Sequence, residues 1–246
     1  MEVLDLVAGR LREAARLTVL TGAGVSAPSG VPTFRGADGL WRRHRPEDLA
    51  TPAAFARDPR LVWEWYDWRR TRIVGCQPNA AHRVLAAWSQ RLPQFTLITQ
   101  NVDGLHERAG TRGVVRFHGT LWELRCARRC STSPPAWADD RVPLPELPPR
   151  CPWCGGLARP NVVWFGEPIE PRALDAAVSA ADCDVFLAIG TSAVVQPAAS
   201  LLAAAHASGA FTVEINLEGT PATALSDAVL RGSADEVLLE LDRRLA

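Results

Sequence analysis

The sequence contains no lysine, one methionine and one tyrosine, Tyr66. All 27 basic residues are therefore arginine, and 27 acidic residues balance them to a formal net charge of zero. A balanced chain has no overall electrostatic field suited to nucleic acid or to an anionic membrane surface. Any recognition of nucleic acid would depend on a local patch of arginines.

A signal peptide and a clear membrane span are also missing. Glu2 and Asp5 stand where a signal peptide carries basic residues, and no apolar core follows them. Residues 185–213 hold no acidic or basic residue apart from His206. Glycine and Gln196-Pro197 interrupt that run, which favours strand, loop and buried helix over a span. We expect a cytoplasmic protein without a membrane partner.

Length and composition indicate a globular protein. The 246 residues are 47% hydrophobic, which suits one medium domain or two small ones sharing a core and excludes disorder. Apolar runs predict strands, and amphipathic patterns predict helices between most of them; this alternation is typical of an α/β fold with a parallel sheet. The predicted strands span residues 17–20, 95–99, 114–117, 185–189 and 211–215, and the predicted helices 2–16, 81–90, 171–180, 197–208 and 235–245.

Two stretches interrupt the alternation. Residues 31–79 are rich in aromatics and predict a helical insertion. Residues 121–165 contain four clustered cysteines and a proline-rich segment without apolar periodicity. Such a segment cannot build its own core, so we expect a metal to hold it together.

A polar cluster directly follows each predicted strand. Because the carboxyl ends of parallel strands meet at one edge of a sheet, these clusters are expected to surround one ligand crevice. The five clusters are Thr21-Gly22-Ala23-Gly24, Gln100-Asn101-Val102-Asp103, His118-Gly119-Thr120, Gly190-Thr191-Ser192 and Asn216-Leu217-Glu218.

The first cluster fits the dinucleotide pattern G-x-G-x-x-A over residues 22–27, in which glycines let the backbone approach a pyrophosphate. The pattern is short, and an ordinary strand-to-helix turn explains it about as well. Gly190, Thr191 and Ser192 could add donors for phosphate, and Asn216 and Glu218 could hold ribose hydroxyls.

The four clustered cysteines predict a closed tetrahedral zinc site with a structural role. The pairs are Cys126 with Cys130 and Cys151 with Cys154. Among the five histidines, His118 stands at a strand end facing the expected crevice, where a neutral imidazole suits proton abstraction.

Taken together, these segments resemble the signatures of the sirtuin family. The resemblance runs in order over nearly the whole chain, although three residues separate the first cysteine pair where the family usually has two. It is carried by residues 22–26, 30–36, 99–106, 117–119, 162–167 and 190–192 and by the four cysteines.

The resemblance implies an NAD-dependent protein-lysine deacylase that transfers the acyl group to ADP-ribose. His118 matches the general base, Asn101 and Asp103 the residues that hold nicotinamide, and Val163 and Phe165 the walls of the lysine tunnel. The other residues that it implies for the cofactor are Gly22, Ala23, Gly24, Ser26, Phe34, Arg35, Gln100, Gly190, Thr191, Ser192, Asn216, Leu217, Glu218 and Ala234.

The resemblance also implies a single catalytic unit of two parts. A large Rossmann-like domain would comprise residues 1–30, 80–120 and 166–246, and a small domain would combine the helical insertion 31–79 with the zinc module 121–165. Acyl-lysine proteins would be the partners. The sequence does not indicate an oligomeric state.

Tyr66 and Arg69 are similar to the Tyr-x-x-Arg pair of the sirtuin branch that removes succinyl and malonyl groups, and Thr33 agrees with that branch. One helical turn places both side chains on one face, where they could bind an acyl carboxylate. Without the resemblance, a solvated arginine-rich helix face would be the better interpretation.

Three alternatives stay open. They are a plain deacetylase, ADP-ribosyl transfer to protein, and a zinc ribbon that binds nucleic acid through Arg42, Arg43 and Arg45 or Arg125, Arg128 and Arg129. The balanced charge and the polar clusters at five strand ends argue against a nucleic-acid-binding zinc ribbon, so we expect no specific nucleic-acid partner.

Overall fold

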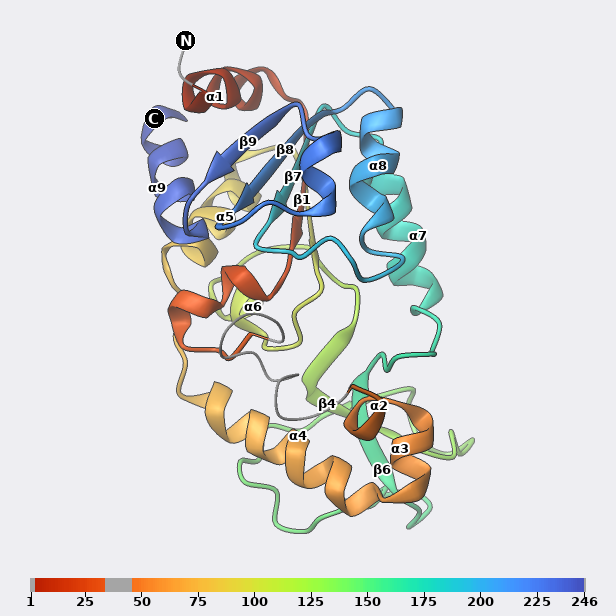
Figure 1. Cartoon of the computed structure of the whole chain (residues 1–246). Coiled ribbons are helices and arrows are strands. Elements are labelled where there is room, and N and C mark those ends of the chain that lie inside the picture. The colour runs from red at the N-terminus through yellow and green to blue at the C-terminus, as the bar shows by residue number, and fades with distance from the viewer. Residues whose placement is uncertain (1–2, 34–45, 246) are drawn as a thin grey trace.

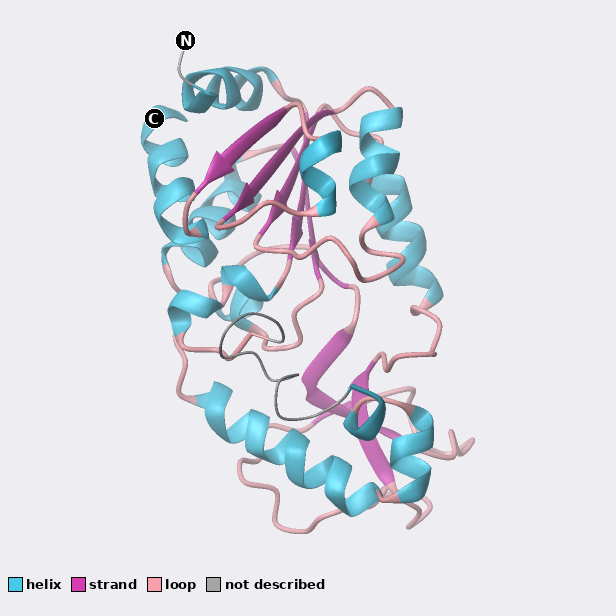
Figure 2. Ribbon diagram, viewed as in Figure 1, coloured by secondary structure: helices cyan, strands magenta, loops and turns pink. Residues whose placement is uncertain are grey.

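The computed structural model describes residues 3–33 and 46–245. A parallel sheet with helices on both faces occupies the upper part of Figure 1, and a smaller part built around helix α4 lies below it. The colouring by secondary structure in Figure 2 shows the same two regions joined by loops. Several of those loops line the large cavity of the protein.

The large sheet has six parallel strands in the order β3-β2-β1-β7-β8-β9. Strand β1 lies between β2 and β7, so the order of the strands reverses at this point. Ligands bind beyond the carboxyl ends of the strands at such a reversal. The strands are β1 (Arg16–Thr21), β2 (Gln94–Thr99), β3 (Val114–Arg116), β7 (Val185–Ile189), β8 (Phe211–Asn216) and β9 (Ala228–Arg231).

Alternate residues of the buried strands pack against helices on opposite faces of the sheet. On β7, Leu187 packs on one face with α1 (Val3–Glu13), α5 (Ala80–Arg91) and α9 (Ala234–Leu245). Phe186 packs on the other face against α7 (Pro171–Ala180) and α8 (Ser200–Ala207). Helices α1 and α9 lie side by side, joined by an ion pair between Asp5 and Arg244.

The smaller part combines helices from the insertion with strands from the cysteine-rich segment. The helices are α2 (Pro46–Leu49), α3 (Pro52–Arg57) and α4 (Pro59–Val74), and the antiparallel strands are β4 (Gly119–Cys126), β5 (Trp137–Ala138) and β6 (Ala158–Val162). Asp58 caps α4 by accepting a hydrogen bond from the Leu61 amide, and Pro59 fills the first helical position.

Residues 121–165 share a core with the helical insertion instead of building one of their own. Leu121, Leu124 and Trp164 are buried in one apolar cluster with Trp63 and Ile73 of α4. The segment therefore buries its apolar side chains against the helical insertion. Strand β4 is hard to recognise because its burial does not alternate regularly: the neighbours Thr120 and Leu121 are both buried.

The predicted helical insertion and the predicted strands of the large sheet are confirmed. The spans agree within one residue for β2, β3, β7 and β8, and β1 is longer by one residue at each end. Strand β9 was not predicted, and α8 begins later than expected, at Ser200. Short connecting helices η1 (Ala23–Val25), η2 (Ala27–Ser29), α6 (Leu105–Arg108) and η4 (Pro221–Leu225) complete the described chain. None of the described helices is long and apolar enough to cross a membrane.

Candidate active site and zinc cluster

A cavity of about 1030 Å³ lies beyond the carboxyl ends of β1, β7 and β8 and extends toward the smaller part. Residues from all five predicted polar clusters line it. The predicted site residues in its wall are Gly22, Ala23, Gly24, Tyr66, Arg69, Gln100, Asn101, His118, Val163, Phe165, Gly190, Thr191, Ser192, Asn216, Leu217, Glu218 and Ala234.

Glycines allow two loops to touch at the floor of this cavity. The Gly24 amide donates to the Gly190 carbonyl at 2.8 Å, and the Gly22 amide donates to the carbonyl of Ile189 at 3.0 Å. A Cβ atom on Gly22 would lie 2.7 Å from the Gly190 oxygen, closer than atoms can pack. The glycines after β1 therefore serve the contact between strand ends, in addition to any approach to a ligand.

Asn101 joins the cavity wall to a buried polar network. Its side-chain amide donates to the Gly22 carbonyl at 3.0 Å and to the Ser26 hydroxyl at 3.2 Å. Ser26 in turn donates to the Asp103 carboxylate at 2.8 Å. Burial raises the pKa of Asp103. Ser26 and Asp103 thus lie behind Asn101, outside the cavity wall.

His118 lies in the turn between β3 and β4, and one of its ring nitrogens is already hydrogen-bonded. Its Nδ1 is 3.1 Å from the Gln100 carbonyl oxygen. A carbonyl only accepts, so Nδ1 carries the proton and Nε2 is left as the acceptor. Burial lowers the pKa of His118, against the opposing effect of the bond to Gln100. A neutral imidazole in the wall of this cavity can take up a proton.

Two further histidines lie behind Ser26, where their rings are 4.8 Å apart. His82 Nε2 is 3.4 Å from the Ser26 hydroxyl, and its Nδ1 is 3.0 Å from Asn79 Oδ1 in the capping box of α5. His106 Nε2 is 3.0 Å from the Thr21 hydroxyl. Burial lowers the pKa of His82 to about 4 and holds that of His106 well below its usual value. Both rings are neutral parts of the scaffold.

Tyr66 and Arg69 enter the cavity from one face of α4. Both are buried, with Tyr66 at 3% and Arg69 at 6% exposure. The Arg69 guanidinium lies 5.0 Å from the centre of the Trp65 ring. Burial lowers the pKa of Arg69, whereas the neighbouring Tyr66 and Asp103 raise it. The alternative of a solvated helix face is therefore excluded for these two residues.

Arg70 points elsewhere. Its guanidinium donates to the carbonyls of Leu121, Asp139 and Arg141 and forms an ion pair with Asp139 at 3.3 Å. Both members of the pair are buried. Arg70 thus fastens α4 to the cysteine-rich segment, and Arg69 alone of the two lines the cavity.

The opposite end of the cavity is formed by the loops after β7 and β8 and by the start of α9. Asn216 donates to the Thr191 carbonyl at 2.8 Å, and Gln100 donates to the Thr191 hydroxyl at 2.8 Å. Glu218 is exposed there, and Ala234 opens α9. Side-chain bonds between the loops therefore fix this end.

Phe34 and Arg35 lie outside the described residues. The sequence reasoning missed several cavity residues, among them Ala50, Trp65 and Ser233. Ala50 is a small residue between two short helices, and only the fold brings its carbonyl to within 2.9 Å of the Phe165 amide. No local pattern could have indicated this contact.

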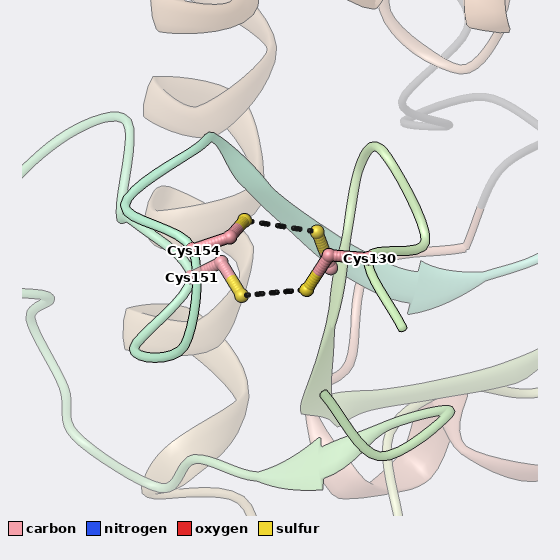
Figure 3. A group of neighbouring side chains, drawn as sticks. Cys130, Cys151 and Cys154 are labelled. Atoms are coloured by element: carbon pink, nitrogen blue, oxygen red, sulfur yellow. Dashed lines mark hydrogen bonds between the residues drawn. The ribbon is translucent and has the colours of Figure 1, made fainter. Parts of the chain in front are cut away.

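The four predicted cysteines gather into one cluster, shown in Figure 3. Their sulfur atoms all lie within 4.8 Å of one another. The Sγ atoms of Cys126 and Cys154 are 3.7 Å apart, and those of Cys130 and Cys151 are 3.9 Å apart. Tetrahedral zinc with Zn–S bonds of about 2.3 Å requires sulfur separations of about 3.8 Å.

The cluster therefore suits one zinc ion, and the three-residue spacing of the first pair fits. None of the four cysteines lines the large cavity. Four thiolates leave no open coordination position, so a bound ion would hold the cysteine-rich segment together without taking part in the reaction.

Known proteins with similar sequences are NAD-dependent deacylases of one family. The sequence matches the Sir2 family over residues 22–197. An NAD-dependent protein deacylase of Aquifex aeolicus is 51% identical over 212 residues, covering 86% of this chain and 87% of that protein. NAD-dependent protein deacylase 1 of Pseudomonas aeruginosa is 51% identical over 247 residues, covering 98% and 97%.

Solved structures of Sir2 proteins have the same fold as this chain. A mutant Sir2 homologue bound to ADP-ribose has a TM-score of 0.93 and 47% identity, covering 100% of this chain and 96% of that one. A Sir2 homologue bound to NAD has a TM-score of 0.89 and 45% identity, with coverage of 98% and 95%. A mutant Sir2 with a deacetylated p53 peptide and 3′-O-acetyl-ADP-ribose has a TM-score of 0.87 and 28% identity, with coverage of 98% and 97%.

The chain therefore belongs to the Sir2 family, whose α/β fold it shares. Within that family it is an NAD-dependent protein deacylase, and NAD is its co-substrate.

Proposed function

We propose that this enzyme removes succinyl and malonyl groups from lysine side chains of proteins. The observation that carries the proposal is that Tyr66 and Arg69 line the same cavity as His118. The guanidinium of Arg69 can bind an acyl carboxylate through two parallel hydrogen bonds, and Tyr66 can add a third. Both residues are buried, so a bound carboxylate would be shielded from competing water.

Small side chains line the same cavity as this pair. Ala50 offers only a methyl group there, and Thr33 lines the same cavity. The Phe165 amide donates to the Ala50 carbonyl, which joins this region to the tunnel residues Val163 and Phe165. We assign these two residues to the aliphatic stem of the lysine, with the substrate backbone pairing alongside as an added strand.

We assign NAD to the remainder of the cavity. When bound it supplies the ribose carbon that receives the acyl oxygen as nicotinamide leaves. The loops at 22–24 and 190–192 would face the phosphates, and residues 216–218 with Ala234 would face the adenosine. Asn101, held by Ser26 in front of Asp103, would orient the nicotinamide amide. Phe34 and Arg35 are proposed to cover the cofactor.

His118 would act as the general base. Its Nδ1–H bond to the Gln100 carbonyl fixes the tautomer with Nε2 free to accept a proton from a ribose hydroxyl. The lowered pKa keeps this nitrogen unprotonated near neutral pH. We propose that the large part (1–30, 80–120, 166–246) and the small part (31–79, 121–165) act as one catalytic unit with the cavity between them.

A plain deacetylase is the second candidate, with Tyr66 and Arg69 serving packing alone. The two are separated by comparing NAD-dependent hydrolysis of one peptide in its acetyl-lysine and succinyl-lysine forms, read by mass spectrometry. We expect Arg69→Met to lower kcat/KM for the succinyl peptide by roughly 100-fold and to spare the acetyl peptide.

Arg72→Met is the matched control, because Arg72 is exposed on the same helix. Its activity should equal that of the wild type on both peptides. If Arg69→Met retains wild-type turnover of the succinyl peptide, Arg69 does not bind an acyl carboxylate. Radiolabelled NAD in the same assay tests ADP-ribosyl transfer, which would leave label on protein.

A further inference from the structure

Tyr66 is held by a residue from another segment that also lines the cavity. The Trp164 Nε1–H group donates to the Tyr66 hydroxyl oxygen at 2.9 Å. Tyr66 comes from α4, and Trp164 comes from the loop after β6, 98 residues later in the chain. Both side chains are 3% exposed. A hydrogen bond between two such residues is well shielded from water.

This bond determines what the Tyr66 hydroxyl can do. An indole N–H group only donates, so it occupies a lone pair of the phenol oxygen and leaves the hydroxyl proton uncommitted. In the described part of the chain, no group accepts a hydrogen bond from that proton. Tyr66 lines the cavity beside Arg69. The hydroxyl is therefore presented to a ligand as a donor.

The indole is itself fixed from several sides. The Arg159 guanidinium lies 3.3 Å above the Trp164 ring. Glu167 accepts two hydrogen bonds from Arg159, at 2.6 and 2.8 Å, and one from the Trp164 amide at 2.9 Å. Phe55 packs against the same ring with centroids 5.3 Å apart. Because the ring and the backbone amide of Trp164 are both held, the direction of the indole N–H group is fixed.

We infer that Trp164 is a positioning residue for acyl specificity. By donating to Tyr66 it forces the phenol to donate, and so favours acyl groups that end in an acceptor carboxylate over acyl groups with an apolar end. Arg159 and Glu167 support this orientation from behind. This role of Trp164 rests on the proposed desuccinylase function, in which the Tyr66 hydroxyl donates a hydrogen bond to the acyl carboxylate.

The variant that tests it is Trp164→Phe, which keeps an aromatic ring for Arg159 and Phe55 but lacks the N–H group. We expect kcat/KM for a succinyl-lysine peptide to fall about fivefold to tenfold, as for the loss of one hydrogen bond between neutral groups. Turnover of the acetyl-lysine form should stay within about twofold, since that peptide makes no use of the Tyr66 proton.

A double-mutant cycle identifies the route of the effect. In a Tyr66→Phe background, Trp164→Phe should cause no further loss with the succinyl peptide, because the hydroxyl that it orients is gone. An equal loss in that background, or an equal loss with the acetyl peptide, would show that Trp164 acts by packing alone. Arg69→Met is measured in parallel. If Arg69→Met retains succinyl turnover, the proposed function fails. If Arg69→Met loses succinyl turnover and Trp164→Phe does not, only the role of Trp164 is overturned.

A spectroscopic test uses the wild-type enzyme and so does not require any variant to fold. Tyr66 is the single tyrosine, so labelling tyrosine with ¹³C at Cζ gives one NMR resonance. We expect the succinyl-lysine peptide to shift this resonance in the zinc-loaded enzyme, and the acetyl-lysine peptide to leave it in place. Equal shifts with both peptides would refute a donor role for the Tyr66 hydroxyl.

Discussion

The buried imidazole of His82 makes a quantitative prediction about stability. Its side chain is 0% exposed, and its Nδ1 atom lies in the capping box of α5. Burial, followed by the charge of Arg83, lowers its pKa from 6.5 to about 4. In the unfolded chain the ring titrates near its ordinary value, so between these two pH values the unfolded state binds more protons.

The native state is therefore destabilised as the pH falls from about 6.5 toward 4. One pKa unit corresponds to 1.36 kcal/mol, so a shift from 6.5 to about 4 corresponds to about 3 kcal/mol once the pH is below both values. At pH 5 the unfolded ring is largely protonated and the folded ring is not, and about 2 kcal/mol of this stability is lost.

The matched variant is His82→Gln, because glutamine at this third helical position can also bond back to the cap residue. Urea unfolding, followed by tryptophan fluorescence at fixed zinc, gives the free energy of unfolding of both proteins at pH 8 and pH 5. The wild type should lose about 2 kcal/mol more than the variant over this interval. A difference between the two proteins that is the same at both pH values would refute a buried neutral His82.

Three further predictions concern the site. His118→Ala should lower NAD-dependent turnover by about 100-fold or more, with zinc content and melting temperature unchanged; retained activity would assign the base elsewhere. Removing zinc with a chelator should raise amide exchange between residues 126 and 157 before the large sheet responds, and unchanged exchange there would contradict a structural metal. Gly24→Ala should cost about 1–3 kcal/mol of stability, measured by urea unfolding, because its Cβ would lie 2.7 Å from Gly190 Cα. Gly9→Ala, with open space around the new atom, is its control.

The parallel sheet could be predicted because its strands are buried on both faces. Val185–Ile189 is continuous in apolar residues, and every position in β7 is buried. Strand β9 escaped prediction because Ala228–Arg231 is short and lies at the sheet edge, where one side chain is exposed. Strands β4 and β6 escaped because their apolar partners lie on α4, more than 40 residues away in sequence.

The convergence of the polar clusters could likewise be predicted, since it follows from strand direction alone. Which residues of these clusters face the cavity, and which lie behind its wall, could not be predicted. Ser26 and Asp103 belong to the same segments as Gly24 and Asn101, yet they lie behind the wall with His82. Whether a polar residue faces a cavity or supports its neighbour depends on contacts between distant segments, here α5 and the loop after β2.

The adjacent arginines of α4 show the same limit at the scale of one helical turn. Helical spacing places both Arg69 and Arg70 one turn along the helix from Tyr66, with about 100° between the two arginines. It does not say which face meets the cavity. The hydrogen bonds decide it: both terminal nitrogens of Arg70 are bonded, to three carbonyls and to Asp139, so Arg70 can be buried in the scaffold. Its position orients the helix, and Arg69 is thereby turned toward the cavity. Arg70→Met should consequently impair acetyl and succinyl substrates alike, whereas Arg69→Met should discriminate between them, and that contrast separates the supporting residue from the specific one.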